Sequence, residues 1–220
     1  MKREDNDAAL VQQYYVELAT AFVRGRLSHL PTLGPGDTLR HGLAAGLRLH
    51  KFKRNAELPR VRRVLGILRA LAPESLLDVG SGRGTFLWPL LDSFPTLLVT
   101  AIDHDLRRAM DLQAVAAGGA HRLTAKRMNA AHLDFPDDAF DGVTLLEVLE
   151  HVPRPEALAA EAVRVAHRFV IASVPSKEDD NPAHIHLFNR HSLGELFTAA
   201  GARRLKFEQV LNHIIVLAGV

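Results

Sequence analysis

The 220-residue chain contains no cysteine, a single tryptophan and two tyrosines, and it has no long hydrophobic run. Without cysteine the protein can form neither disulfides nor thiolate-bound metal sites, an absence that fits a cytoplasmic protein. The apolar runs are too short to cross a bilayer, and the polar start MKREDND does not resemble a signal peptide. We therefore expect a cytoplasmic globular protein, and 47% hydrophobic residues suffice for a substantial core.

Positive charge is concentrated in the first third of the chain. Residues 1–72 hold 13 Lys and Arg against 6 Asp and Glu, whereas the remainder holds 14 against 19. Between residues 40 and 63, eight basic residues face a single acid, Glu57. This basic 40–63 stretch could attract RNA or another polyanion, but its apolar residues recur at helical spacing, so its charges could simply point to solvent.

A glycine-rich turn follows a short apolar run in SLLDVGSGRG, residues 75–84. The run is typical of a buried parallel strand, and glycines at 80, 82 and 84 predict a tight turn into a helix. We expect glycine there because side chains would keep a ligand away from the backbone N–H groups. The dinucleotide pattern G-x-G-x-x-G has its third glycine where Thr85 stands here. The segment predicts a nucleotide-type ligand, and its spacing disfavours NAD.

The same segment resembles motif I of the class I S-adenosylmethionine (SAM)-dependent methyltransferases, in which an acidic residue precedes GxGxG. In that family the loop backbone lies against the methionine part of SAM. The resemblance covers about residues 72–220 and implies that SAM is the cofactor. It assigns cofactor binding to Asp78, Gly80, Ser81, Gly82 and Gly84.

Strands and helices alternate from residue 73 onward. We expect strands at 75–79, 97–102, 122–127, 140–146, 168–174, 203–209 and 213–219, with helices at 84–92, 105–117, 155–166 and 191–200. Alternation predicts a doubly wound α/β fold whose ligands bind at the carboxyl ends of parallel strands. The last two strands predict an antiparallel hairpin. The pattern resembles the seven-stranded, mostly parallel sheet of the class I methyltransferases.

Residues 1–72 are predicted to form a helical N-terminal extension, with helices at 8–30, 39–53 and 59–71. Residues 73–220 form the SAM-binding domain. Methyl transfer depends on aligning the reactants and excluding water. We therefore expect the extension to be a lid or a substrate-facing cover.

Two further segments match cofactor-binding positions of the family. Asp103 ends the second predicted strand, where an acid can accept hydrogen bonds from a ribose diol. The resemblance implies that His104 lies beside the adenine, and that Asn129 and Ala130 form the loop near the adenine amino group. Asn129 replaces the family's acid, but its side-chain carbonyl can still accept that hydrogen bond.

The fourth predicted strand runs into an E-x-x-E-H pattern formed by Glu147, Glu150 and His151. Two carboxylates and an imidazole can hold a divalent metal such as Mg or Mn. The pattern resembles two metal-dependent groups of O-methyltransferases, one that acts on the 3′-terminal ribose 2′-oxygen of small RNAs and one of ubiquinone synthesis. The first group takes two Glu and two His, which makes His184 the fourth ligand and His186 the substitute. Many metal-free relatives carry a similar stretch, and Glu147 is then also a cofactor contact.

The sequence as a whole favours a SAM-dependent methyltransferase that O-methylates a small hydroxylated substrate, with catalytic roles for His151, His184 and Glu147. A bound metal would lower the pKa of the acceptor hydroxyl, whereas without one a histidine would be the general base. RNA ribose 2′-O-methylation and a non-catalytic SAM-binding protein are the alternatives. The chain lacks an obvious RNA-binding module, which favours the small molecule. The sequence does not predict the oligomeric state.

Overall fold

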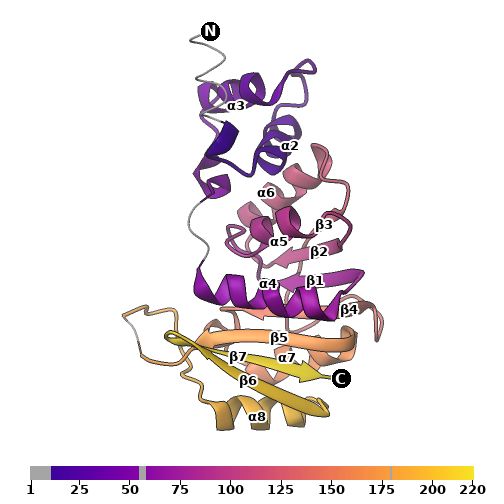
Figure 1. The fold of residues 1–220 in the computed structure, drawn as a ribbon, viewed down its shortest axis with the longest axis vertical. Helices are drawn as coiled ribbons and strands as arrows, with labels where there is room; N and C mark the ends of the chain where they lie inside the picture. The colour runs from indigo at the N-terminus through magenta and orange to yellow at the C-terminus, as the bar shows by residue number, and fades with distance from the viewer. Residues whose placement is uncertain (1–10, 55–57, 179) are drawn as a thin grey trace.

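Seven strands form one sheet in the order β3-β2-β1-β4-β5-β7-β6 (Figure 1). The computed structural model describes residues 11–54, 58–178 and 180–220. Its strands are β1 Ser75–Val79, β2 Leu98–Asp103, β3 Leu123–Arg127, β4 Phe140–Leu146, β5 Ala166–Pro175, β6 Arg204–Val210 and β7 His213–Gly219. Neighbours among β1 to β5 pair in parallel, and β7 is antiparallel to both β5 and β6. The predicted α/β fold with a terminal antiparallel hairpin is confirmed.

Helices cover the sheet and form most of the N-terminal part. They are α2 Val16–Arg26, α3 Pro35–Ala44, α4 Pro59–Leu71, α5 Leu87–Ser93, α6 Leu106–Ala117, α7 Pro155–Val165 and α8 Arg190–Ala199, with short 3-10 helices η1 Leu49–Phe52 and η2 Leu149–His151. The single helix expected over 39–53 is wrong, because Gly46 adopts φ of 76° after Ala44 and interrupts it. Within the described ranges, no helix is both long and apolar enough to cross a membrane.

The core lies on both faces of the sheet because successive strand residues point to opposite sides. Leu76 of β1 packs with Leu65 of α4 and the apolar side chains of α5 and α6. Leu77, the next residue, packs with Leu158 of α7 and Phe197 of α8. Burying a leucine stabilises a fold by about 2 kcal/mol, so β1 is firmly held between the two helix layers.

The N-terminal helices are fixed to the sheet domain through α6. A Cβ at Gly25 of α2 would lie 1.9 Å from the Ala114 carbonyl oxygen, and one at Gly118 would lie 1.7 Å from that of Ala21. The two backbones therefore touch at positions where only glycine fits. Asp111 of α6 also pairs with Arg26 and with Lys51, which follows α3 in the chain.

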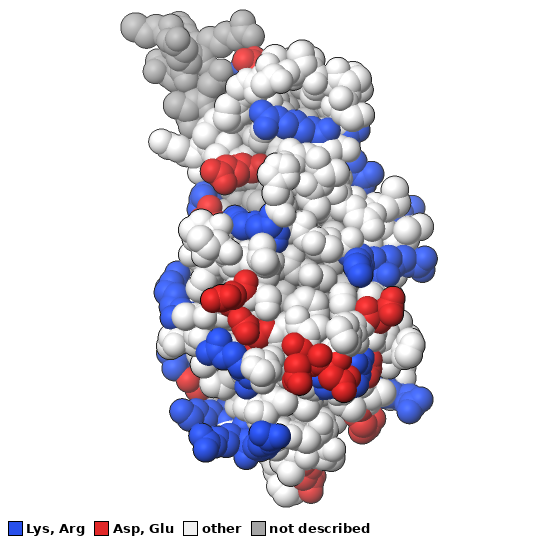
Figure 2. Space-filling model, turned by 90° about the vertical axis from the view of Figure 1, so that its right-hand side faces the viewer, with Lys and Arg blue, Asp and Glu red and all other residues white. Residues whose placement is uncertain are grey.

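The parallel strands end at the left edge of the sheet in Figure 1, where the turns after β1, β2 and β4 also lie. The opposite edge faces the viewer in Figure 2, which shows Lys and Arg interspersed with Asp and Glu and no extended field of one sign. Ligands of open α/β sheets bind beyond the carboxyl ends of the strands. The candidate site is therefore expected at the left edge of the sheet.

Candidate functional site

The turn after β1 can be built only with glycine at two of its positions. Gly80, Gly82 and Gly84 have φ of 70°, 59° and 84°, in the left-handed region. A Cβ at Gly80 would lie 2.7 Å from Cγ2 of Val148, and one at Gly84 would lie 2.0 Å from Cε2 of Trp88. The close approach that glycine permits is thus to neighbouring side chains of the protein.

The N–H groups of this loop are directed into the protein, contrary to the expectation that they would face a ligand. Four of them have an internal acceptor: Gly80 and Ser81 donate to the Ile102 carbonyl at 2.9 and 3.1 Å, Gly82 to the Asp103 carboxylate at 2.9 Å, and Gly84 to the Ser81 carbonyl at 2.9 Å. The turn folds back so tightly that it bonds to the end of β2 and to itself. These four groups are therefore not free to bind a pyrophosphate.

A pocket of 220 Å³ lies above this loop, between the ends of β1 and β4. It is lined by Arg60, Val61, Asp78, Gly80, Ser81, Gly82, Arg83, Thr85, Phe86, Arg108, Leu146, Glu147 and His151. Five of the predicted cofactor residues are in this lining: Asp78, Gly80, Ser81, Gly82 and Glu147. Gly84, Asp103, His104, Asn129 and Ala130 are not. We call it the cofactor pocket.

Asp78 is the buried acid of the cofactor pocket. Its Oδ1 accepts a hydrogen bond from Oγ1 of Thr144 at 2.8 Å, whereas Oδ2 has no hydrogen-bond partner among the described residues. Burial raises the pKa of Asp78 to about 6, even though the hydroxyls of Ser81 and Thr144 favour the ionised form. An unsatisfied buried carboxylate oxygen on a residue that lines a pocket suits a cationic ligand.

Asp103, at the end of β2, lies behind the loop and outside the pocket lining. Only 2% of the residue is exposed, and its Oδ2 and Oδ1 accept the N–H groups of Gly82 and Asp105, both at 2.9 Å. Arg108 lies 3.7 Å from Oδ2, and the exposed His104 lies 3.7 Å from Oδ1. Asp103 therefore holds the glycine loop in place. A carboxylate has further lone pairs, so ribose binding stays a prediction.

The turn after β3 lies beside the end of β2, as expected. The N–H of Met128 donates to the Asp103 carbonyl at 3.1 Å. Asn129 is exposed, and its Oδ1 accepts the N–H of Ala131 at 3.1 Å, which closes a local turn. Asn129 and Ala130 are thus close to Asp103 in space, although neither lines the cofactor pocket.

Glu147 stands in a strained conformation at the end of β4, with φ of 59°. Its Oε1 accepts from Oγ of Ser173 at 2.8 Å and lies 3.7 Å from Nε of Arg60, and its Oε2 lies 3.0 Å from Nε2 of His213. Sequence reasoning missed His213, which lies 66 residues away and reaches Glu147 only because β7 pairs with β5. No local pattern could have found it.

The structure brings together three of the four predicted metal ligands. Candidate ligand atoms of Glu150, His151 and His184 lie within 4.8 Å of one another. Glu147 is outside this trio. Nδ1 of His151 lies 2.8 Å from the Ala183 carbonyl, which can only accept, so Nδ1 carries the proton and Nε2 keeps its lone pair. His186, the substitute, instead approaches the Val152 carbonyl through its own Nε2 at 3.0 Å.

A second cavity, of 320 Å³, opens between the N-terminal segment and the glycine loop. Arg83 and Thr85 line both this cavity and the cofactor pocket. Gly84 and Trp88 contribute to its wall from the sheet domain, and Tyr15 from the N-terminal part. The two spaces therefore form adjoining parts of one site.

Comparisons with known proteins agree with this architecture. A family model described as "Methyltransferase domain" matches residues 77–169. A phosphatidylethanolamine N-methyltransferase of Cereibacter sphaeroides is 33% identical over 95 residues, which are 42% of this chain and 45% of that protein. A ubiquinone/menaquinone biosynthesis C-methyltransferase of Methylobacterium nodulans is 35% identical over 95 residues, or 42% of this chain and 38% of that protein. The matches span less than half the length of these relatives.

Among solved structures, a SAM-dependent methyltransferase from Aquifex aeolicus superposes with a TM-score of 0.62 at 21% identity, over 74% of this chain and 91% of that one. A likeness at this identity shows a shared fold. The glycine loop, the seven-stranded sheet and the matched domain all agree with this fold. Residues 77–169 match a methyltransferase domain, and the chain has the class I, Rossmann-like fold that SAM-dependent methyltransferases share.

Proposed function

We propose that the protein is a SAM-dependent methyltransferase that binds the cofactor in the pocket above the glycine loop. The observation that carries this proposal is the buried Oδ2 of Asp78, which has no hydrogen-bond partner among the described residues and precedes a loop with four N–H groups bonded internally. A carboxylate there attracts the positively charged groups of SAM, including the amino-acid ammonium that SAH also carries, and repels the pyrophosphate of NAD. The site thus favours SAM on electrostatic grounds, in addition to the glycine spacing.

The acceptor atom is proposed to be the oxygen of a small hydroxylated molecule. Bound SAM supplies an electrophilic methyl group. His151 lines the cofactor pocket, and its Nε2 carries a lone pair because Nδ1 donates to Ala183, so it can accept the proton of an acceptor hydroxyl. The relatives are named as N- and C-methyltransferases, whereas the base positioned in this pocket favours an oxygen acceptor.

A metal-assisted version of the reaction has its own support in the trio of Glu150, His151 and His184. One fully buried carboxylate and two imidazoles fit a divalent ion, and the imidazoles suit Mn better than Mg, which prefers oxygen ligands. Such an ion would lower the pKa of an acceptor hydroxyl. Glu147, bonded to Ser173 and near His213, would then contact cofactor or substrate without ligating the metal.

A small molecule is favoured over RNA because much of the basic 40–63 stretch is paired with acids. Lys51 pairs with Asp111, Arg54 with Asp92 and Arg63 with Glu208, while Arg60 approaches Glu147. These pairs lower the net field that a phosphate backbone would meet. The N-terminal segment, which lines the second cavity, is proposed to act as a substrate-facing cover.

Calorimetric titration tests the cofactor. We expect S-adenosylhomocysteine (SAH) and SAM to bind with one site per chain and NAD to give no heat of binding. Binding of NAD in place of SAH would overturn the proposal. Slow release of SAH from SAM in the presence of candidate hydroxylated acceptors would then distinguish an enzyme from a non-catalytic SAM-binding protein.

A further inference from the structure

We infer that the second cavity binds the methyl acceptor, and that this acceptor is a small amphipathic anion with an apolar body and a carboxylate or phosphate group. The inference rests on the methyltransferase function proposed above. The cavity adjoins the cofactor pocket through Arg83 and Thr85. Its volume of 320 Å³ lies at the lower end of the range of about 300–1,000 Å³ that is usual for small-molecule sites.

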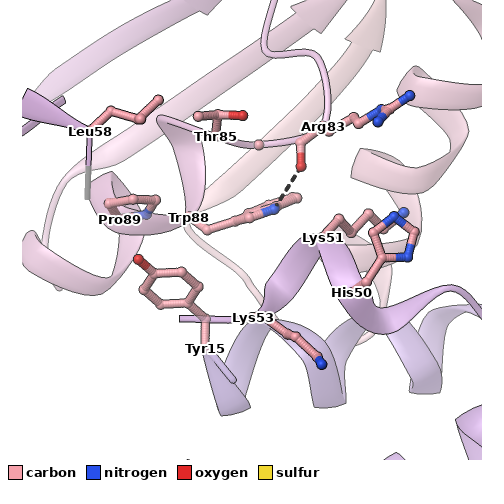
Figure 3. Close-up of a pocket in the computed structure, with 10 residues that line it drawn as sticks. Tyr15, His50, Lys51, Lys53, Leu58, Arg83, Thr85, Trp88 and Pro89 are labelled. Carbon is pink, nitrogen blue, oxygen red and sulfur yellow. Dashed lines mark hydrogen bonds between the residues drawn. The ribbon is translucent and has the colours of Figure 1, made fainter. Parts of the chain in front are cut away.

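One side of the cavity is apolar and rigid. Figure 3 shows Trp88 in the middle of the site, with Leu58, Pro89 and Tyr15 on one side of it. Nε1 of Trp88 donates to the Arg83 carbonyl at 2.9 Å, and its ring packs against Phe52 with centroids 4.8 Å apart. The indole is therefore fixed before a ligand arrives. An apolar or aromatic group can pack here with little ordering cost.

The other side of the cavity is basic. His50, Lys51 and Arg83 lie across Trp88 from Leu58 and Pro89 in Figure 3, and Lys53 also lines the cavity. Among the residues that the structure describes, no acidic residue belongs to the lining. The ammonium group of Lys51 is held by Asp111, but among the described residues the side chains of His50, Lys53 and Arg83 have no ion-pair partner.

Positive charge without an acidic partner beside an apolar wall favours a ligand that has both an anionic group and an apolar body. A carboxylate or phosphate gains charge-assisted hydrogen bonds from Lys53 and Arg83, while a neutral molecule gains only the apolar contact. A polymer such as RNA would instead need basic groups spread over the open surface. Arg48 and Arg62 are exposed basic residues of the same 40–63 stretch that do not line the cavity, so they serve as matched controls.

The cavity contains the only tryptophan of the chain, so intrinsic fluorescence reports its occupancy directly. The full chain is titrated, with and without saturating SAH, with benzoate, phenyl phosphate and benzamide. We expect a saturable change with at least one of the two anions, and binding of the neutral benzamide to be about tenfold weaker. The tighter of the two anions identifies the carboxylate or the phosphate as the preferred group.

Two double variants then test which basic residues bind the anion. His50→Gln with Lys53→Gln is expected to weaken anion binding by about tenfold, whereas Arg48→Gln with Arg62→Gln leaves it unchanged. None of these four residues lines the cofactor pocket, so the calorimetric affinity for SAH stays the same in both variants and confirms that they fold.

The inference is overturned if benzamide binds as tightly as the anions, if neither anion changes the fluorescence, or if both double variants weaken binding equally. Displacement of the bound anion by a short oligouridine that depends on Arg48 and Arg62 would also overturn it, in favour of RNA. Failure of SAH to bind is a separate result. It would contradict the proposed function, while the titrations without SAH would still decide the nature of the cavity.

Discussion

The two halves of the site are built in different ways. On the proposed cofactor side, the ends of β1 and β2 supply Asp78 and Asp103, and the turns after β1 and β3 supply the glycine loop and Asn129. On the proposed acceptor side, Tyr15 and Trp88 line one cavity, Glu147 lies beside His213 and His151 lies beside Ala183, across gaps of 32 to 73 residues in the chain. Glu147 and His151 also line the cofactor pocket.

This difference corresponds to the two functions that we propose for the site. The geometry of the cofactor side is held by backbone hydrogen bonds between parallel strands, so it should change little when surface side chains are substituted. The acceptor side depends on side chains brought together by the N-terminal segment, the 180–189 segment and the β6–β7 hairpin. Such a division lets one fold keep its cofactor while its acceptor varies. The predictions below test the division.

The largest effect is expected from a methyl group added to the glycine loop. Gly84→Ala combines left-handed strain with a clash against Trp88, and should lower the free energy of unfolding by about 3 kcal/mol. Gly82→Ala carries strain alone, since its Cβ would lie 3.7 Å from the Gly80 carbonyl oxygen, and should cost about 1 kcal/mol. Urea unfolding of both variants measures the difference. Equal losses would show that the clash is relieved.

The proposed metal site assigns different roles to Glu150, which is in the trio, and Glu147, which is outside it. Mn²⁺ binding followed by calorimetry should weaken about 100-fold in His184→Ala, because a ligand is lost, and should be kept in Glu147→Ala, which is outside the trio. His191→Ala, an exposed histidine near neither site, is the control. Loss of Mn²⁺ binding in Glu147→Ala would instead favour the four-ligand set expected from sequence.

The free energy of unfolding of the unliganded protein should depend on pH because of Asp78. Because burial raises its folded-state pKa to about 6, this group contributes stability below its unfolded pKa, and that contribution is lost as pH rises through about 6. Asp78→Asn should remove this slope between about pH 4 and 6 and be as stable as wild type or more so at pH 7.5. Urea unfolding across this range, without SAM, measures it. A slope that persists in the variant would assign it to another group.

The smallest effect is expected at Asn129. It is exposed and its side-chain oxygen already accepts the N–H of Ala131, so Asn129→Ala should weaken SAH binding by less than about tenfold. Calorimetry measures this change, with an unfolding curve as control. A much larger loss would place Asn129 in direct contact with the adenine.

Strand-end motifs were predictable from sequence because their geometry is local. The β1, β4 and β7 ranges match expectation, and Asp78 and the glycines lie where the pattern places them. The direction of the loop N–H groups was not predictable, since it depends on Ile102 and Asp103 in another strand. Likewise, no periodicity reveals that His213 reaches Glu147 or that Trp88 lines a cavity with Tyr15. These contacts follow from sheet order and helix packing.

The most direct test of the account is SAH binding to wild type, Asp78→Asn and Asp141→Asn at pH 7.5. Asp141 caps the start of β1 through the N–H groups of Glu74 and Ser75, at the other end of the strand from the pocket. We predict that wild type and Asp141→Asn bind SAH with equal affinity, and that Asp78→Asn binds about 100-fold more weakly because a buried charge-assisted contact is lost. Equal binding by all three proteins, or no binding of SAH by wild type, would contradict the account.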